Sequence, residues 1–310
     1  MVGVKSRRKS IRLILDKSEF ERSAKEQYIQ VFDNCELRTL SFETVRNPSE
    51  DIEIMFIPGL LPIFPRWEKV IKNLNENYKV HFIESRDKLT SRLNRKTSME
   101  ICEMSNDLDI IEKALELNKR KYITISSSMG ASLVLENLAR KSISPIGSIL
   151  IGPMAEMYSP RWILVLLKIL PPFTVKWFKP LIRWGIRTKM VDAEKEPEQL
   201  EDYINSINVA DCSKLRKWIL DNANKYNCLD ILPKINTRII LVGTSTDMTH
   251  DCTIAVDIAH RLINCTYIEL RSNKAAHDLA FVEIAFEFIK ELAGIGPKLT
   301  DKIPNKIINN

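Results

Sequence analysis

Residues 122–135 read "YITISSSMGASLVL", where three serines, a methionine and a glycine join two apolar segments. The first segment is typical of a buried strand and the second of a helix. A sharp turn between them needs small residues on both sides of Ser128, and Ser126 and Gly130 meet that need. The N–H groups at the start of the helix favour an anion that forms nearby. The stretch therefore predicts a nucleophile at Ser128, although serine is also common as a plain helix cap.

Short apolar stretches alternate with amphipathic ones on both sides of this turn. Such alternation indicates right-handed βαβ crossovers and a mostly parallel sheet flanked by helices, an α/β fold. The predicted strands are residues 36–45, 51–60, 78–85, 121–126, 146–153, 236–243 and 265–271. The predicted helices are residues 66–75, 98–117, 130–141, 252–263 and 280–292.

Residues 154–225 interrupt the alternation, because they are rich in tryptophan and proline and carry no strand pattern. We expect a helical lid inserted between two strands, above the sheet edge where open α/β sheets bind their ligands. The predicted organisation is a basic N-terminal extension with a helix over 10–32 (1–32), a core (33–153 and 226–296), the helical lid insertion (154–225) and a C-terminal tail (297–310).

The composition is that of an ordinary globular protein, with 45% hydrophobic and 28% charged residues among 310. No apolar run reaches the ~18 residues that span a bilayer. The basic N-terminus lacks the apolar core of a secretory signal. The six cysteines form no CxxC pair and no cluster with histidine. We therefore expect no metal site, no cofactor and no disulfide framework, and a cytoplasmic location.

Two further residues can complete a proton relay with Ser128. Asp247 follows the penultimate predicted strand, and His277 lies in the loop after the last one. A neutral imidazole can take the serine proton and return it to the leaving group, while a carboxylate fixes the tautomer of the ring. The order serine, acid, histidine is the one that this chemistry uses on such a fold.

Other residues compete for the two supporting roles. Asp251 stays open as a second choice for the acid, and His250 is a rival base beside it. The remaining histidines, His81 within a predicted strand and His260 on a predicted helix, fit structural positions better.

The sequence also offers donors for an oxyanion hole. One is the N–H of Met129, directly after the predicted nucleophile. The other is the N–H of Leu60 in the segment 58–61, where Gly59 lets the backbone turn its N–H groups inward. Taken alone, a Pro-Gly pair equally well ends a strand.

From Glu53 to Gly294, the insertion excepted, the chain resembles the α/β-hydrolase superfamily of lid-bearing esterases and lipases. The shared features are the order of strands and helices, the serine elbow, the acid after the penultimate strand and the histidine after the last. The resemblance implies a serine hydrolase that cleaves an ester or thioester through an acyl-enzyme. It assigns the triad and the oxyanion donors to Ser128, Asp247, His277, Leu60 and Met129.

Three features depart from the family pattern. Ser126 replaces the first glycine of the elbow, "Pro58-Gly59" replaces the frequent His-Gly, and Asp247 lies four residues after Gly243 rather than three. None of these changes removes a chemical group that the mechanism needs. A non-catalytic member that binds or regulates stays an alternative, as does another reaction on the same fold.

The insertion combines apolar and basic side chains. Residues 161–190 carry seven cations and no acid, and residues 1–12 carry five cations and no acid. The apolar residues can line an acyl pocket, pack the insertion onto the core, or contact an anionic membrane surface together with the cations. An anionic substrate is a further possible partner, whereas no nucleic-acid-binding motif is present. The residues assigned to the substrate lid are Trp162, Trp177, Phe178 and Trp184.

Overall fold

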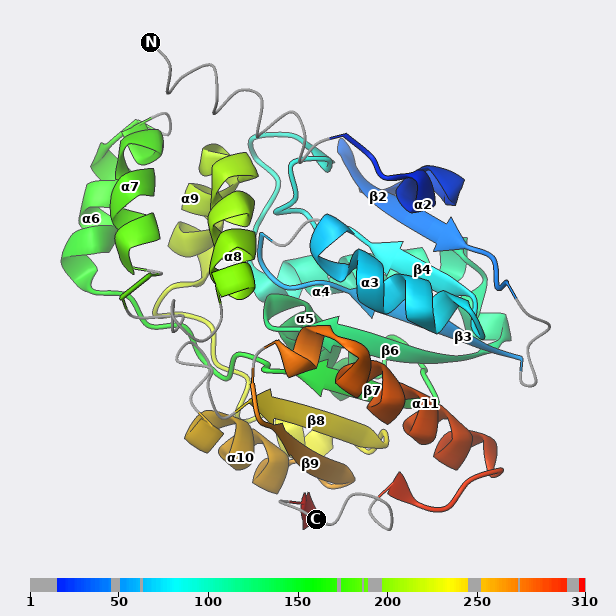
Figure 1. The fold of residues 1–310 in the computed structure, drawn as a ribbon. Helices are drawn as coiled ribbons and strands as arrows, with labels where there is room; N and C mark the ends of the chain where they lie inside the picture. The colour runs from blue at the N-terminus through cyan, green and yellow to red at the C-terminus, as the bar shows by residue number, and fades with distance from the viewer. Residues whose placement is uncertain are drawn as a thin grey trace.

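The computed structural model describes residues 16–45, 51–61, 64–171, 174–185, 187–188, 197–244, 252–272, 274–299 and 307–309. Its strands join in one sheet with the order β1-β2-β4-β3-β6-β7-β8-β9-β10, and β5 pairs with β2 (Figure 1). The strands are β1 (Lys25–Phe32), β2 (Cys35–Phe42), β3 (Ile52–Ile57), β4 (Val80–Ile83), β5 (Arg92–Leu93), β6 (Lys121–Ser127), β7 (Gly147–Ile151), β8 (Ile239–Thr244), β9 (Cys265–Leu270) and β10 (Ile307–Asn309).

Six neighbouring strands of the sheet, β4, β3, β6, β7, β8 and β9, are parallel to one another, as the alternation of elements predicts. Strands β3, β7 and β8 are buried along their whole length, which explains their continuously apolar sequences. The antiparallel strands lie at the two ends of the sheet, where β1, β2 and β5 flank β4 and where β10 flanks β9. The tail expected after residue 297 thus contributes an edge strand.

Helices cover both faces of the sheet and form two hydrophobic cores (Figure 1). One core lies under α4, α5 and α10, and the other lies under α3 and α11. Along β3, the side chains of Ile54 and Phe56 enter one core and those of Met55 and Ile57 enter the other. These helices are α3 (Phe64–Asn75), α4 (Ile101–Ala114), α5 (Met129–Arg140), α10 (Cys252–Arg261) and α11 (Leu279–Ala293).

The helix predicted over residues 10–32 is wrong for its second half. A short helix, α2 (Glu19–Ser23), precedes β1, which pairs antiparallel with β2. The hairpin turns at Asn34, whose φ of 56° suits asparagine. Buried Arg38 of β2 binds Glu21 of α2 at 2.7 Å and Glu26 of β1 at 2.8 Å. This pairing between distant residues outweighs the weak helical pattern, which is why local periodicity misled.

The insertion between β7 and β8 is helical, as expected. Its described helices are α6 (Arg161–Ile169), α7 (Val175–Gly185), α8 (Pro197–Val209) and α9 (Cys212–Asn222). At the end of α9, Asn222 accepts a hydrogen bond from Ile101 N–H at 2.8 Å, which ties the insertion to the start of α4. Across the described residues, no helix has the length and apolar character that crossing a membrane requires.

Candidate functional site

Ser128 is the single residue between β6 and α5. Its backbone has φ 47° and ψ −120°, a strained conformation for a residue with a side chain. The Ser128 N–H donates to the carbonyl of Ile151 on the neighbouring strand at 2.8 Å. Ser128 is partly exposed, whereas Ser127 and Met129 on either side are buried. The sharp strand-to-helix turn expected from the sequence is therefore present, with Ser128 at its apex.

The loop after β3 packs directly against this turn. A Cβ atom on Gly130 would lie 2.5 Å from the carbonyl oxygen of Ile57 and 2.6 Å from that of Pro58, so only glycine fits. A Cβ atom on Gly59 would lie 3.0 Å from the Cβ of Ser128. The glycines at these positions therefore allow the loop to approach the apex of the turn.

A hydroxyl neighbour of the apex fixes the same loop. Ser127 accepts a hydrogen bond on Oγ from the N–H of Gly59 at 2.9 Å, across 68 residues of sequence. The hydroxyl of Ser126 is buried, and in the described structure it has no hydrogen-bond partner. The three serines thus differ: Ser126 is a small buried residue, Ser127 holds the loop and Ser128 occupies the apex.

A buried ion pair holds the other side of the loop. Lys88 and Asp87 lie 2.6 Å apart, and each side chain is 1% exposed. Lys88 donates to the carbonyl of Gly59 at 2.7 Å, while Asp87 accepts from the N–H of Leu61 at 2.9 Å. Because the C=O and N–H of a trans peptide point in opposite directions, the N–H of Leu60 points away from Lys88. Sequence reasoning missed this pair, since no motif connects it to the loop.

The two N–H groups predicted for an oxyanion hole remain available. Met129 is the first residue of α5, so its N–H has no intrahelical acceptor. Among the described residues, no hydrogen-bond acceptor contacts the N–H of Met129 or that of Leu60. Leu60 belongs to the loop that packs on the Ser128 turn, so both donors border the same apex.

The predicted base lies against α3. His277 ends a short 3-10 turn, η5 (Ala275–His277), that follows β9. Its ring centroid lies 4.4 Å from that of Trp67, and its Nε2 lies 3.3 Å from Nη2 of Arg66. Since α3 follows the loop that borders Ser128, His277 lies against the helix into which this loop leads. The next residue, Asp278, instead caps α11 and pairs with Lys69 at 2.5 Å.

The predicted acid falls outside the described residues. Asp247, the alternative acid Asp251 and the rival base His250 all lie between Thr244, where β8 ends, and Cys252, where α10 begins. The structure therefore describes the two elements that flank the acid and not the acid itself.

The histidine expected to be structural is embedded in the sheet. His81 of β4 has Nδ1 2.8 Å from Ser41 Oγ on β2 and Nε2 2.7 Å from Glu53 on β3. Burial raises the pKa of Glu53, but hydrogen bonds from His81 and Arg120 outweigh it and lower that pKa to about 2. His260 lies in the last turn of α10 and is exposed. Neither histidine approaches the Ser128 turn.

Helix α8 of the insertion covers the loop and the start of α3. Leu61 packs with Leu200, Tyr203 and Ile207 of α8. The guanidinium carbon of Arg66 lies 4.6 Å from the centroid of the Tyr203 ring. The insertion thus closes over the same loop that borders Ser128.

The tryptophans assigned to the substrate lid face solvent. Trp162, Trp177 and Trp184 are 67%, 73% and 60% exposed, respectively. The side chain of Phe178 lies outside the described part of the structure. The three indoles therefore do not pack the insertion onto the core.

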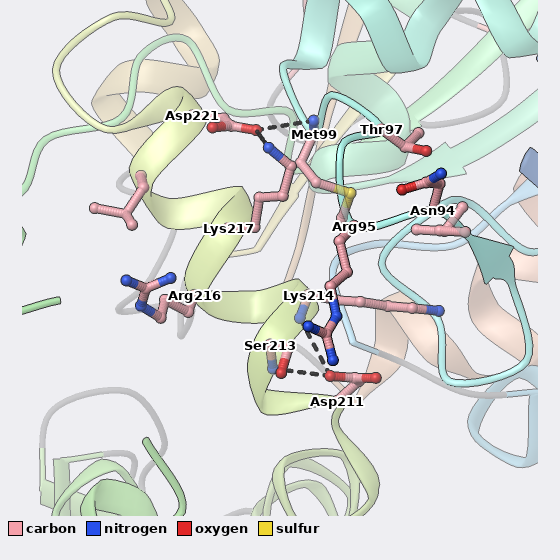
Figure 2. A pocket seen from close by; sticks show the side chains of 12 residues that line it. Asn94, Arg95, Thr97, Met99, Asp211, Ser213, Lys214, Arg216, Lys217 and Asp221 are labelled. Carbon is pink, nitrogen blue, oxygen red and sulfur yellow. Dashed lines mark hydrogen bonds and ion pairs between the residues drawn. The ribbon is translucent and has the colours of Figure 1, made fainter. Parts of the chain in front are cut away.

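A separate cleft of about 810 Å³ lies between α9 and the segment 93–99 (Figure 2). Its acids serve the local structure, because Asp211 caps α9 and Asp221 accepts from the N–H of Met99 at 3.0 Å. Neither Ser128 nor His277 lines this cleft, so it is distinct from the predicted site. The other lining residues are Leu93, Asn94, Arg95, Thr97, Ser213, Lys214, Arg216, Lys217 and Leu220.

No protein-family model and no curated protein matches the sequence. Solved structures do match the fold. An esterase from Thermogutta terrifontis is 15% identical, with 87% of this chain and 99% of that chain covered and a TM-score of 0.69. An enol-lactonase from Burkholderia xenovorans is 15% identical, with 85% of this chain and 100% of that chain covered and a TM-score of 0.69. A bromoperoxidase from Bacillus anthracis is 15% identical, with 86% of this chain and 100% of that chain covered and a TM-score of 0.70. The chain has the α/β-hydrolase fold, and its neighbours on that fold differ in reaction.

Proposed function

Because the chain has the α/β-hydrolase fold, we propose that it is a serine hydrolase that cleaves an ester or thioester of a hydrophobic acyl substrate. Ser128 Oγ attacks the acyl carbonyl carbon, and His277 takes the serine proton and passes it to the departing alcohol or thiol. Water then hydrolyses the acyl-enzyme with His277 as base again. The observation that carries the proposal is the strained backbone of Ser128 at the strand-to-helix junction, with φ 47°.

The oxyanion formed in this reaction binds the N–H groups of Leu60 and Met129. The support for this assignment is the loop geometry, in which Ser127 accepts from the N–H of Gly59 and Lys88 donates to the carbonyl of Gly59. Donors that are fixed before the reaction stabilise the developing charge without reorganisation. The carboxylate that orients His277 is assigned to Asp247, with Asp251 as the alternative.

The contact between Arg66 and His277 bears on the protonation of the base. A guanidinium only donates hydrogen bonds, so the 3.3 Å contact leaves His277 Nε2 as the acceptor. That tautomer keeps its proton on Nδ1, where an orienting carboxylate binds, and its lone pair on Nε2, where a general base needs it. Catalysis requires that this lone pair turn from Arg66 to Ser128.

The same contact favours the second candidate, a non-catalytic binding or regulatory protein. If Arg66 held His277 permanently, the serine would have no base and the fold would serve only for binding. The two candidates differ in whether the protein turns over any acyl substrate.

Hydrolysis of p-nitrophenyl esters of increasing acyl length tests the proposal. We expect turnover that rises with chain length, and a loss of ~10³-fold or more in Ser128→Ala and in His277→Ala. His260→Ala, at an exposed histidine of α10, is the matched control and should keep full activity. Asp247→Asn should cost less than Ser128→Ala or His277→Ala, since the acid only orients the base. Equal rates for the wild type and Ser128→Ala would reject the enzyme and leave the binding protein.

A further inference from the structure

Arg66 is a buried cation with unused hydrogen-bond donors. Its side chain is only 4% exposed, and its Nε and Nη1 have no acceptor in the described structure. Among the described residues, Nη1 forms an ion pair with the carboxylate of Asp202 on α8, at a distance of 3.7 Å that is beyond a hydrogen bond. The side chain of Asp202 is 48% exposed. Buried donors without partners are rare, because each one loses its hydrogen bonds to water.

The other buried arginines show what a satisfied guanidinium looks like in this protein. All three nitrogens of Arg38 bind carboxylates, at distances of 2.7, 2.8 and 3.2 Å. All three nitrogens of Arg86 bind Asp107 or backbone carbonyls, at distances from 2.6 to 3.3 Å. Arg66 alone among these three has nitrogens without a hydrogen-bond acceptor in the described chain. Its free donors therefore fit a ligand rather than the fold.

The position of Arg66 relates that ligand to the proposed reaction. Nη2 lies 3.3 Å from Nε2 of His277, the nitrogen that is proposed to accept the proton of Ser128. An anion on the guanidinium would therefore lie beside the reacting atoms.

We propose that Arg66 binds a carboxylate of the substrate, so that the hydrolase prefers esters whose hydrophobic acyl chain ends in a second, anionic group. This inference rests on the proposed function. A planar carboxylate matches the fork of the guanidinium and forms charge-assisted hydrogen bonds with it. Its arrival would give Nε and Nη1 their missing acceptors and would draw Arg66 away from His277, which frees the base.

A pair of esters of equal length tests the specificity. Mono-p-nitrophenyl adipate carries a terminal carboxylate where p-nitrophenyl hexanoate carries a methyl group. We expect the wild type to prefer the adipate ester and Arg66→Gln to lose ~10- to 100-fold in kcat/KM for it. For hexanoate, which has no carboxylate to draw Arg66 away, we expect a gain rather than a loss, because removing the guanidinium frees His277. Arg66→Lys keeps the charge and should retain part of the preference. Equal losses on both esters would mean a merely structural role and would overturn the proposal.

Binding of free adipate separates this proposal from the reaction itself. In isothermal titration calorimetry, adipate should bind the wild type and Ser128→Ala, and it should bind Arg66→Gln at least ten times more weakly than the wild type. Arg95→Gln, at an exposed arginine of the cleft in Figure 2, is the control and should bind adipate like the wild type. Arg66-dependent binding without any ester hydrolysis would sink the proposed reaction and keep the anion site. Ester hydrolysis without adipate binding would overturn the anion site and keep the proposed reaction.

A different observation concerns the outer helices of the insertion. On α6, the side chains of Trp162, Val165, Leu166 and Ile169 form one stripe with helical spacing and are 67%, 54%, 37% and 75% exposed. The opposite face of α6 is partly buried, and Arg216 of α9 binds the carbonyl of Leu167 at 2.6 Å. A helix that is apolar on both faces is normally buried. The exposed stripe of α6 therefore lacks a partner among the described residues.

The neighbouring helix extends this apolar and basic character. On α7, Trp177 and Trp184 are seven positions apart, share one face and are 73% and 60% exposed. Both α6 and α7 pack on α9, at the end of the molecule far from β9 (Figure 1). The segment 161–190 that contains the two helices carries seven cations and no acid. Of these, Arg161, Lys168 and Arg187 are exposed, whereas Lys179 donates to the carbonyls of Asn208 and Ala210. Indoles prefer the boundary between water and lipid, and the cations suit anionic headgroups.

From this charge complementarity we infer a second, independent property: the exposed faces of α6 and α7 bind an anionic membrane surface. Co-sedimentation should show binding to vesicles of phosphatidylcholine with phosphatidylglycerol, little binding to phosphatidylcholine alone, and release as salt rises to about 0.5 M. The double variant Trp162→Ser/Ile169→Ser should lose most of the binding. The control Ile263→Ser/Ile295→Ser removes residues that are 56% and 65% exposed elsewhere and should bind normally.

Two results would overturn this inference. One is that the wild type co-sediments with neither vesicle type at low salt. The other is a dimer in sedimentation velocity that Trp162→Ser/Ile169→Ser converts to a monomer, since a second copy of the chain would then cover the stripe.

Discussion

The three serines of the segment 126–128 have different structural roles, and the sequence predicts only the role of Ser128. Ser128 is identified by its local pattern, because a strand, a small-residue turn and a helix follow one another directly. The bond between Ser127 and Gly59 joins residues 68 positions apart. Nor could the sequence connect Lys88 with the carbonyl of Gly59. Such contacts depend on which strands become neighbours in the sheet.

Removing one partner of the Asp87–Lys88 pair should destabilise the protein strongly. Lys88→Met leaves the carboxylate of Asp87 buried without its cation, which typically costs about 3–5 kcal/mol. The double variant Asp87→Asn/Lys88→Met removes both charges and should recover part of that loss. Urea unfolding of the wild type, both single variants and the double variant measures the coupling. A cost below about 1 kcal/mol for Lys88→Met would contradict a buried pair.

The sequence predicts the strands and helices that have a strong apolar pattern. It does not predict the strands at the edges of the sheet, which depend on pairing with a neighbouring strand. The central strands and their crossover helices appear where periodicity places them, because burial on both faces leaves a continuous apolar signal. Strand β1 was mistaken for part of a helix, since most of its side chains are exposed or only partly buried. Strands β5 and β10 are two and three residues long and leave no periodic signal.

The link between β2, β3 and β4 through His81 predicts how stability depends on pH. Hydrogen bonds lower the pKa of Glu53 from 4.5 to about 2, so folding favours the ionised form. Its contribution, on the order of 3 kcal/mol, is fully present above pH 4.5 and is lost as the pH falls toward about 2.

Comparison of the wild type with Glu53→Gln isolates this contribution. The difference in unfolding free energy should be largest near neutral pH and should shrink below pH 4.5, the ordinary value for this carboxyl. Glu43→Gln, at a carboxylate that is 71% exposed and pairs with Lys79, serves as the control and should change little. A difference that grows on acidification would have the wrong sign.

The whole molecule places the candidate site where a parallel α/β sheet puts its ligands, at the carboxyl ends of the strands. The Ser128 turn follows β6, the Gly59 loop follows β3 and the turn with His277 follows β9 (Figure 1). Helix α8 of the insertion packs on that loop through Leu61. The sequence predicts this convergence, because the carboxyl ends of parallel strands share one edge. It could not reveal Arg66, whose neighbours come from η5 and α8.

Labelling with a fluorophosphonate probe shows whether Ser128 is an activated nucleophile. We expect one covalent adduct by intact mass, located on Ser128 by peptide mapping, absent in Ser128→Ala and formed far more slowly in His277→Ala. The probe phosphonylates an activated serine with loss of fluoride and does not need the true substrate, so the result does not depend on acyl specificity. No adduct at any pH from about 6 to about 9, the range in which a histidine base loses its proton, would contradict the account. An adduct that persists in Ser128→Ala would contradict it equally.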